Sequence, residues 1–149
     1  MRQVDELWMG EIPPHSLASV EATFAKFDLP FTITRSDSQP YFQIAANPAL
    51  DAVVRAEFVS ELARLGYPFE LVHLGQDSER YSFLPNLGIH RVSLNEIGEE
   101  QLSFGHLEEL LRQSGGSNRE FRSLLQRAVG EPWTSAIQLI RGSERLRVA

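Results

Sequence analysis

The order of hydrophobic patterns in the first 75 residues is the feature that most constrains how this chain folds. Segments with strand-like alternation and segments with the apolar stripe of an amphipathic helix follow one another as strand, helix, strand, strand, helix, strand. Five turn-forming residues, 36–40, separate the two middle strands and predict a hairpin. The predicted strands are 7–9, 31–34, 41–46 and 69–74, and the predicted helices are 17–27 and 48–65.

The helix predicted over 48–65 carries the clearest end signals. Asn47 is a good N-cap, and Pro48 suits the first turn of a helix, where its missing N–H costs nothing. Gly66 can adopt the left-handed conformation that ends a helix. With right-handed crossovers, the whole order predicts an α+β fold of the ferredoxin-like split βαβ type (βαββαβ), in which an antiparallel sheet lies against two helices.

The second half of the chain is predicted to add strands and helices to this core. Two strand-like stretches flank a turn containing Pro and Gly, and three helical stripes follow, one of which begins with a capping box of Ser117 and Glu120. These added helices are expected either to cover the open face of the sheet or to form a small cap, and the tail from Gly142 is expected to be loose. The predicted single domain, 1–149, comprises a core (1–75), an extended segment (76–98) and a helical cap (99–142).

Composition excludes several classes of protein. The chain has no cysteine, which excludes a disulfide scaffold, a thiolate nucleophile and a cysteine zinc site. Its net charge of −6 disfavours nucleic acid as a partner, because that binding needs clustered cations. No apolar run approaches the ~20 residues that span a bilayer, and the N-terminal residues are acidic rather than leader-like. We therefore expect a cytoplasmic protein without a membrane partner.

The stretch from Arg80 to His90 reads Arg-Tyr-Ser-Phe-Leu-Pro-Asn-Leu-Gly-Ile-His. It resembles the core motif of a small actinobacterial family known only as a domain of unknown function, Arg-Tyr-Ser-aromatic-x-Pro-x-Leu-Gly-Ile. The chain departs from that pattern at His90 and Arg91, where the family has an aromatic residue and then His. The resemblance implies no known activity, so it supports the fold more than a function. A second likeness to the family lies in Leu124-Leu125, Gly130 and Trp133.

Arg80 and its neighbours Tyr81 and Ser82 are the best candidates for a specific binding site. If residues 80–83 form a strand, Arg80 and Ser82 share one face, while Tyr81 and Phe83 share the other. The aromatic face would pack, and the Arg80 fork can bind a carboxylate or a phosphate. The alternative is structural, because the Pro and Gly residues of 85–88 predict a tight turn beneath the C-terminal helices.

Four further positions are candidates for binding. His73 lies on a predicted core strand, where it is either a hydrogen-bonded buried histidine or a sheet-face base. His90 ends the motif, and Trp133 belongs either to the core or to an interface. Arg141 lies in residues 112–149, where seven arginines and three glutamates form a local basic surface. That surface is either solvated helix faces or a docking surface for an acidic partner.

No assembled catalytic, metal or cofactor constellation is visible in the sequence. The histidines form no paired metal-ligand motif, and neither a phosphate loop nor a nucleophile elbow is present. We therefore expect a non-enzymatic interaction or regulatory protein, without a cofactor, that binds a larger protein partner. A small acidic ligand is a further candidate partner. The alternative is a small cofactor-free enzyme or effector-binding module. Its cleft between sheet and helices would contain His73, Arg80, Tyr81 and His90.

Overall fold

The computed structural model describes residues 4–35 and 40–148, with side chains as far as residue 142. Within these residues, seven strands form one antiparallel sheet and five α-helices accompany it, so the fold is mixed α+β. The strands are β1 (Val4–Ile12), β2 (Thr32–Arg35), β3 (Phe42–Ala46), β4 (Phe69–Leu74), β5 (Glu79–Leu84), β6 (Gly88–Leu94) and β7 (Glu100–Gln101). The helices are α1 (Leu17–Lys26), α2 (Ala52–Leu65), α3 (Phe104–Gln113), α4 (Asn118–Ala128) and α5 (Glu131–Val148), with a 3₁₀ helix η1 (Pro14–Ser16) before α1.

The sheet is larger than the four-stranded one expected from the first half of the chain. Its strand order is β2-β3-β1-β4-β5-β6-β7, and every neighbouring pair is antiparallel. The predicted order of the first six elements is observed, and β2 and β3 pair as the predicted hairpin, whose residues 36–39 lie outside the described residues. The segment 76–98 is more than an extended connection, because it contributes β5 and β6 to the same sheet.

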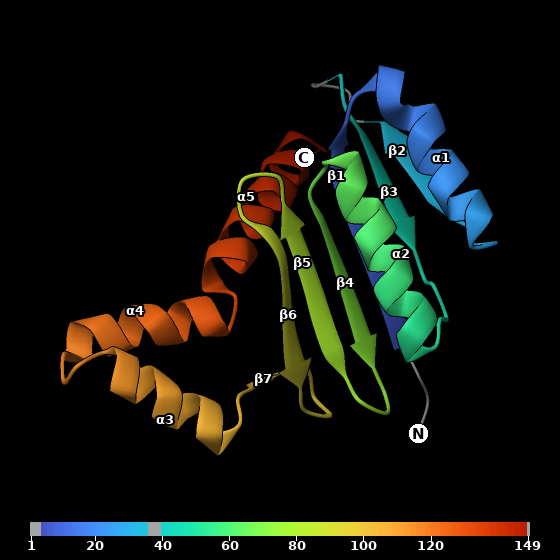
Figure 1. Ribbon diagram of the computed structural model, residues 1–149. Helices are drawn as coiled ribbons and strands as arrows, with labels where there is room; N and C mark the ends of the chain where they lie inside the picture. Colours follow the sequence, from blue (N-terminus) through green and yellow to red (C-terminus); the bar gives the residue numbers. More distant parts are fainter. Residues whose placement is uncertain (1–3, 36–39, 149) are drawn as a thin grey trace.

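One face of the sheet is covered by α1 and α2 and contains the main hydrophobic core (Figure 1). Phe24 of α1 and Phe58 of α2 are fully buried, and their rings meet edge to face with centroids 5.4 Å apart. Such aromatic pairs add roughly 0.5–1.5 kcal/mol beyond the burial of their surface. The sheet residues of this core are Leu7, Met9, Ile12, Ile44, Ala46, Phe69, Leu71, Tyr81 and Phe83.

Helix α2 begins later than its sequence signals indicate. The prediction that Asn47 and Pro48 start the helix is wrong, because Asp51 is the N-cap and its carboxylate accepts a hydrogen bond from the backbone N–H of Val54 at 3.0 Å. The Asn47 side chain instead donates to the carbonyl of Asp5 at 3.0 Å, which ties β1 to the chain before α2. The C-terminal signal is confirmed, since Gly66 has φ +88°.

The opposite face of the sheet carries a second, smaller apolar cluster under α5. Trp8 of β1 and Leu84 of β5 pack there with Trp133 and Ile137 of α5. Figure 1 shows α5 running behind the sheet, whereas α3 and α4 project beyond its β6–β7 edge. Of the two expected arrangements of the C-terminal helices, coverage of the open sheet face is seen for α5, whereas α3 and α4 extend away from the sheet.

The last helix also corrects the prediction for the tail. The expected loose segment after Gly142 is wrong within the described residues, because α5 continues to Val148. An interior glycine costs a helix only about 1 kcal/mol, which the surrounding helical residues offset. None of the helices in the described ranges is long and apolar enough to cross a membrane.

The junction between α4 and α5 is packed against the sheet at Gly130. This glycine has φ +87°, and a β-carbon on it would lie 2.7 Å from both Cε1 and Nδ1 of the His90 ring. Gly116, between α3 and α4, has φ +86° but would place a β-carbon within 4 Å of nothing. The two glycines therefore share the backbone conformation but differ in their surroundings.

We expect Gly130→Ala to lower the midpoint of thermal unfolding by several degrees more than Gly116→Ala. Both variants carry the left-handed backbone cost of roughly 1–2 kcal/mol, but only the alanine at 130 must displace the His90 ring. Circular dichroism melts of the two variants and the wild type measure the difference. Equal losses in the two variants would contradict close packing at this junction.

Candidate ligand site between the sheet and the last helix

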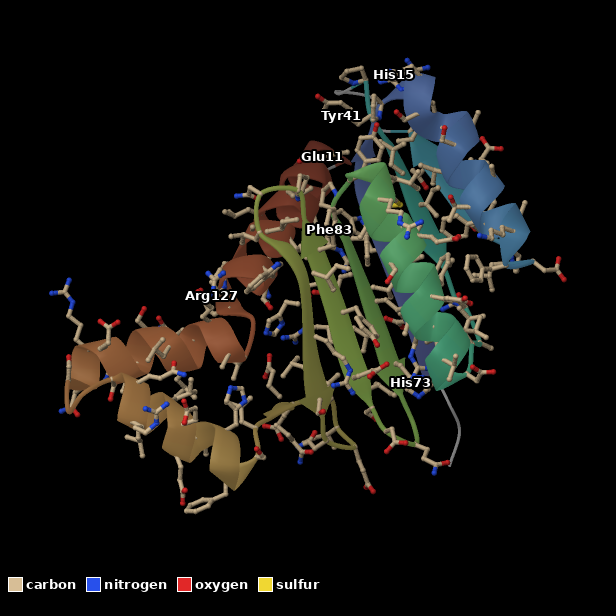
Figure 2. The ribbon with its side chains drawn as sticks, viewed as in Figure 1. Glu11, His15, Tyr41, His73, Phe83 and Arg127 are labelled. Atoms are coloured by element: carbon tan, nitrogen blue, oxygen red, sulfur yellow. The ribbon has the colours of Figure 1, made fainter. Side chains whose placement is uncertain are left out.

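The candidate site is built on the residues of β5 whose side chains lie on the sheet face away from α1 and α2. Tyr81 and Phe83 point into the core beneath α2, so Arg80 and Ser82 lie on the opposite face, which α5 partly covers. Figure 2 shows Phe83 near one end of α2. The strand pattern therefore separates the aromatic and polar residues of the motif as the sequence predicts.

Arg80 connects three elements from a buried position. Its side chain is 10% exposed, Nη1 donates to Oε1 of Glu100 in β7 at 3.0 Å, and Nη2 donates to the carbonyl of Val129 after α4 at 3.0 Å. Arg80 thus holds the C-terminal end of α4 rather than the turn at 85–88. That turn is held instead by Trp133, whose indole N–H donates to the carbonyl of Gly88 at 2.9 Å.

His90 is the second residue that anchors the end of α4. Its Nε2 lies 2.9 Å from the carbonyl of Ala128, and its ring lies against Trp133 with centroids 4.7 Å apart. Burial lowers the pKa of His90, and the positive charges of Arg80 and Arg127 act in the same direction, against the opposing effect of the Ala128 hydrogen bond. The neutral ring therefore donates from Nε2, which leaves the lone pair on Nδ1. Figure 2 shows Arg127 at the end of α4 nearest α5.

Most of the unpaired buried polar atoms gather in this region. Among the described residues, five buried side-chain nitrogen or oxygen atoms have no hydrogen-bond partner, and four of them are Nε of Arg80, Oγ of Ser82, Nδ1 of His90 and Oγ1 of Thr134. A buried polar group without a partner costs roughly 1–3 kcal/mol. Three of these groups can donate a hydrogen bond, so the region suits a guest that accepts hydrogen bonds.

A cavity of about 490 Å³ lies between β4, β5 and α5, and Arg80 and Thr134 are the two of these four residues that line it. Arg80, Arg141 and Glu70 supply its charged groups, and Thr134, Ile137 and Gln138 complete the wall. Burial raises the pKa of Glu70, although the charges of Arg80 and Arg141 oppose that shift. Arg80 is paired with Glu100, which does not line the cavity, whereas Arg141 lies 3.8 Å from Glu70 without a hydrogen bond, so the guanidinium of Arg141 can bind an anion.

The register of the strands explains how these residues meet. Glu70 of β4 lies directly opposite Ser82 of β5, which in turn lies opposite His90 of β6. On the other side, Glu70 lies opposite Trp8 of β1, which lies opposite Ala45 of β3. These five residues form one row across the sheet face next to α5, and we call them the cross-strand row.

A family model described as "Protein of unknown function (DUF3145)" matches residues 45–146, which is more than half of the chain. The chain belongs to the DUF3145 family. The expected membership of a family of unknown function is therefore confirmed. In this DUF3145 protein the matched region includes Arg80, Ser82, His90, Thr134 and Arg141. A search of curated proteins and a search of solved structures each found no match.

Five of the seven predicted binding residues lie on this side of the DUF3145 sheet. Arg80 and Ser82 lie on β5, and His90 lies opposite Ser82 on β6. Trp133 and Arg141 extend from α5 on the same side of the sheet. Arg141 places Nη1 3.8 Å from Oε1 of Glu70 and its guanidinium 5.3 Å from the Trp8 ring centre. The other two predicted residues are His73 and Tyr81.

His73 and Tyr81 lie on the opposite face, so the prediction of one cleft containing both with Arg80 and His90 is wrong. Strand alternation places them beneath α2, and Figure 2 shows His73 near the other end of that helix from Phe83. Nδ1 of His73 lies 2.5 Å from Oδ1 of Asp5, and Nε2 lies 3.0 Å from the carbonyl of Gln76. Both partners accept hydrogen bonds, which makes His73 a structural link between β1 and the turn after β4.

Sequence reasoning missed three residues of the site in this DUF3145 protein: Glu70, Thr134 and Gln138. Glu70 did carry a signal, since it is a carboxylate inside a strongly apolar strand. Thr134 and Gln138 are four residues apart and so share a face of α5, but nothing local distinguishes that face from a solvated one. Within the described ranges, no group of three or more His, Asp or Glu side chains is placed to hold a metal ion.

We expect His90→Gln to flatten the pH dependence of stability in mildly acidic solution. Because the pKa of His90 is lowered on folding, the unfolded chain binds its proton more readily, and the wild type loses stability as the pH falls below the ordinary histidine value of 6.5. Glutamine can still donate to Ala128 but does not titrate. Urea unfolding of both proteins between pH 7.5 and 5 tests this, and parallel curves would contradict it.

Proposed function

We propose that this protein is a non-enzymatic regulatory module that binds a small anion, a carboxylate or a phosphate, in the cavity between the sheet and α5. The observation that carries the proposal is a cavity lined by two arginines in which Nε of Arg80 and Oγ1 of Thr134 have no hydrogen-bond partner. Arg80 retains an N–H donor at Nε, and Ser82 and Thr134 add hydroxyl donors. An anion would satisfy these donors together with the charge of Arg141.

The arrangement of Ser82 and His90 favours binding over the alternative of a cofactor-free enzyme. The two residues lie opposite each other on neighbouring strands, where a serine and a base could form a hydrogen bond. Neither Oγ of Ser82 nor Nδ1 of His90 has a partner, so these atoms do not form an activated pair. Nδ1 of His90 packs against Gly130, which leaves the Ser82 hydroxyl as the group of the two that could donate to a ligand.

The bonds of Arg80 support a regulatory role for the ligand. While Nε remains available, Nη1 and Nη2 hold Glu100 and the carbonyl of Val129. A ligand that orients this guanidinium would strengthen the attachment of α4 to the sheet. Occupancy of the cavity would thereby influence the projecting α3 and α4, which are the elements available to a larger protein (Figure 1).

Two further parts of the proposal concern the fold type and the setting of the protein. We infer that β1 to β4 with α1 and α2 form a ferredoxin-like unit, supported by the antiparallel order β2-β3-β1-β4 and by helices on one face. We also propose that the protein is cytoplasmic and of actinobacterial origin. The acidic charge and the absence of cysteine support the first, and the likeness of the 80–90 motif supports the second.

We expect phosphate or acetate to bind, and Arg141→Gln to weaken that binding about tenfold while Arg64→Gln leaves it unchanged. Arg141 lines the cavity and its side chain is 38% exposed, so its loss removes charge without opening the core. Arg64 is an exposed cation of α2 on the opposite side of the sheet. Titrations followed by ¹H–¹⁵N NMR measure both affinities, and equal affinities in the two variants would contradict the site.

Glu70→Gln provides the opposite test of the same site, because it removes the carboxyl that competes with the anion. We expect it to tighten phosphate binding several-fold. Since the pKa of Glu70 is raised on folding, ionisation of this group destabilises the wild type as the pH rises past the ordinary glutamate value of 4.5. The stability of Glu70→Gln relative to the wild type should therefore increase between pH 4 and pH 7, as measured by urea unfolding.

A larger protein partner is the second candidate, and it is favoured by the exposed apolar side chains of α3. Phe104 is 76% exposed and Leu111 is 55% exposed. Their separation of seven residues, about two helical turns, places them on the same side of α3. Scattered single apolar residues need no explanation, but a pair on a projecting helix suits a contact with another protein. This contact would use a surface separate from the anion cavity.

We expect a partner captured from lysate of the native host to be lost with the double variant Phe104→Ser, Leu111→Ser. The control is Val53→Ser on α2, where the side chain is 77% exposed and its loss should leave capture unchanged. Mass spectrometry of the captured material measures the outcome. Retention of the same partner by the double variant would exclude α3 as its docking surface.

A further inference from the structure

A second cavity of about 210 Å³ adjoins the candidate anion site. Trp8, Ala45 and Val72 contribute its apolar wall, from β1, β3 and β4, and Glu6 and Asn47 add polar groups at its lining. Glu70 and Arg141 line both this cavity and the larger one next to Arg80. The two cavities therefore meet at the Glu70–Arg141 pair.

The Glu70–Arg141 pair is a weak barrier between the cavities. The closest nitrogen and oxygen atoms are 3.8 Å apart, which is beyond hydrogen-bond distance, and the Arg141 side chain is 38% exposed. Partly exposed ion pairs contribute little to stability, so this one can separate at small cost. Arg141 also lies over Trp8, which would keep its guanidinium close to both cavities after separation.

The two adjoining cavities lie along the cross-strand row, so together they form an elongated space with two different ends. From Ala45 through Trp8 and Glu70 to Ser82, successive residues lie directly opposite one another on four neighbouring strands. Neighbouring strands are about 4.8 Å apart, so the row is longer than a bare phosphate or carboxylate. The polar end of the row lies by Arg80, and the apolar end lies by Trp8 and Ala45.

We propose that the ligand is an elongated anion whose charged group lies by Arg80 and Arg141 and whose apolar group occupies the second cavity against Trp8, Ala45 and Val72. This inference rests on the proposed function and adds the class of ligand to it. An apolar cavity of about 150 Å³ is large enough for a benzene ring, so the smaller cavity accommodates one aromatic or short branched aliphatic group. The anionic group would replace Glu70 as the partner of Arg141.

The test compares two pairs of probes that differ only by the apolar group: phosphate with phenyl phosphate, and acetate with phenylacetate. Burial of a phenyl ring is expected to tighten binding at least tenfold within each pair. The chain has two tryptophans, of which Trp8 lines the second cavity and Trp133 lines neither. The Trp8 indole N–H signal in ¹H–¹⁵N spectra therefore reports on the second cavity, and the Trp133 signal serves as a reference. We expect phenyl phosphate to shift the Trp8 signal strongly, and phosphate to shift it little.

Ala45→Leu is the variant that tests the second cavity, because Ala45 is exposed at its edge and a larger side chain there would fill it. It should abolish the gain from the phenyl group and leave the affinity for phosphate unchanged. The matched control is Ala22→Leu, an exposed alanine of α1 on the other side of the sheet, which should retain the full gain. Thermal melts verify that both variants fold.

The outcomes separate this inference from the proposed function. Binding of phosphate or acetate without a gain from the phenyl group, or a gain that survives Ala45→Leu, would overturn the elongated ligand and leave the anion site intact. Failure of all four probes to bind would overturn the proposed function and this inference with it. A preference for one pair of probes over the other would show whether the charged group is a phosphate or a carboxylate.

Discussion

The rest of the structure depends on β5 being buried on both faces. All six of its residues, Glu79–Leu84, are buried, with α2 on one side and α5 on the other. Strands in such positions are usually almost wholly apolar, because water cannot reach their polar groups. This strand nevertheless contains a glutamate, an arginine and a serine, so each must find its partners within the protein. The positions of the neighbouring arginines and of the end of α4 follow from that requirement.

The two faces of β5 meet the requirement in different ways. Beneath α2, Glu79 accepts hydrogen bonds from Nε of Arg55 at 2.9 Å and from Nε of Arg91 at 2.6 Å. Burial alone would raise the pKa of Glu79, but these hydrogen bonds and charges hold it below the ordinary value. Beneath α5, Arg80 is bonded at two of its three nitrogens, and Ser82 is unbonded at its hydroxyl. The first face is therefore a satisfied structural network, and the second retains groups that can receive a ligand.

The candidate site also combines residues inside the region that the family model matches with a residue outside it. Its polar half, around Arg80, Ser82 and Thr134, lies wholly within the region matched by the DUF3145 model, 45–146. Trp8, at the apolar end, lies before that region and reaches the site through the pairing of β1 with β4. The proposed elongated ligand would thus touch both the matched region and the strand added by the N-terminal part of the fold.

The sequence by itself determined the elements and their faces, because both depend on short-range periodicity. Alternation was sufficient to separate Arg80 and Ser82 from Tyr81 and Phe83, and apolar spacing was sufficient to order the strands and helices of the first half. Tertiary structure decided which residues meet, because register joins strands that are distant in the chain. The row from Trp8 through Glu70 to His90, the removal of His73 from the site, and the choice of Asp51 over Asn47 as a cap all depend on such pairings.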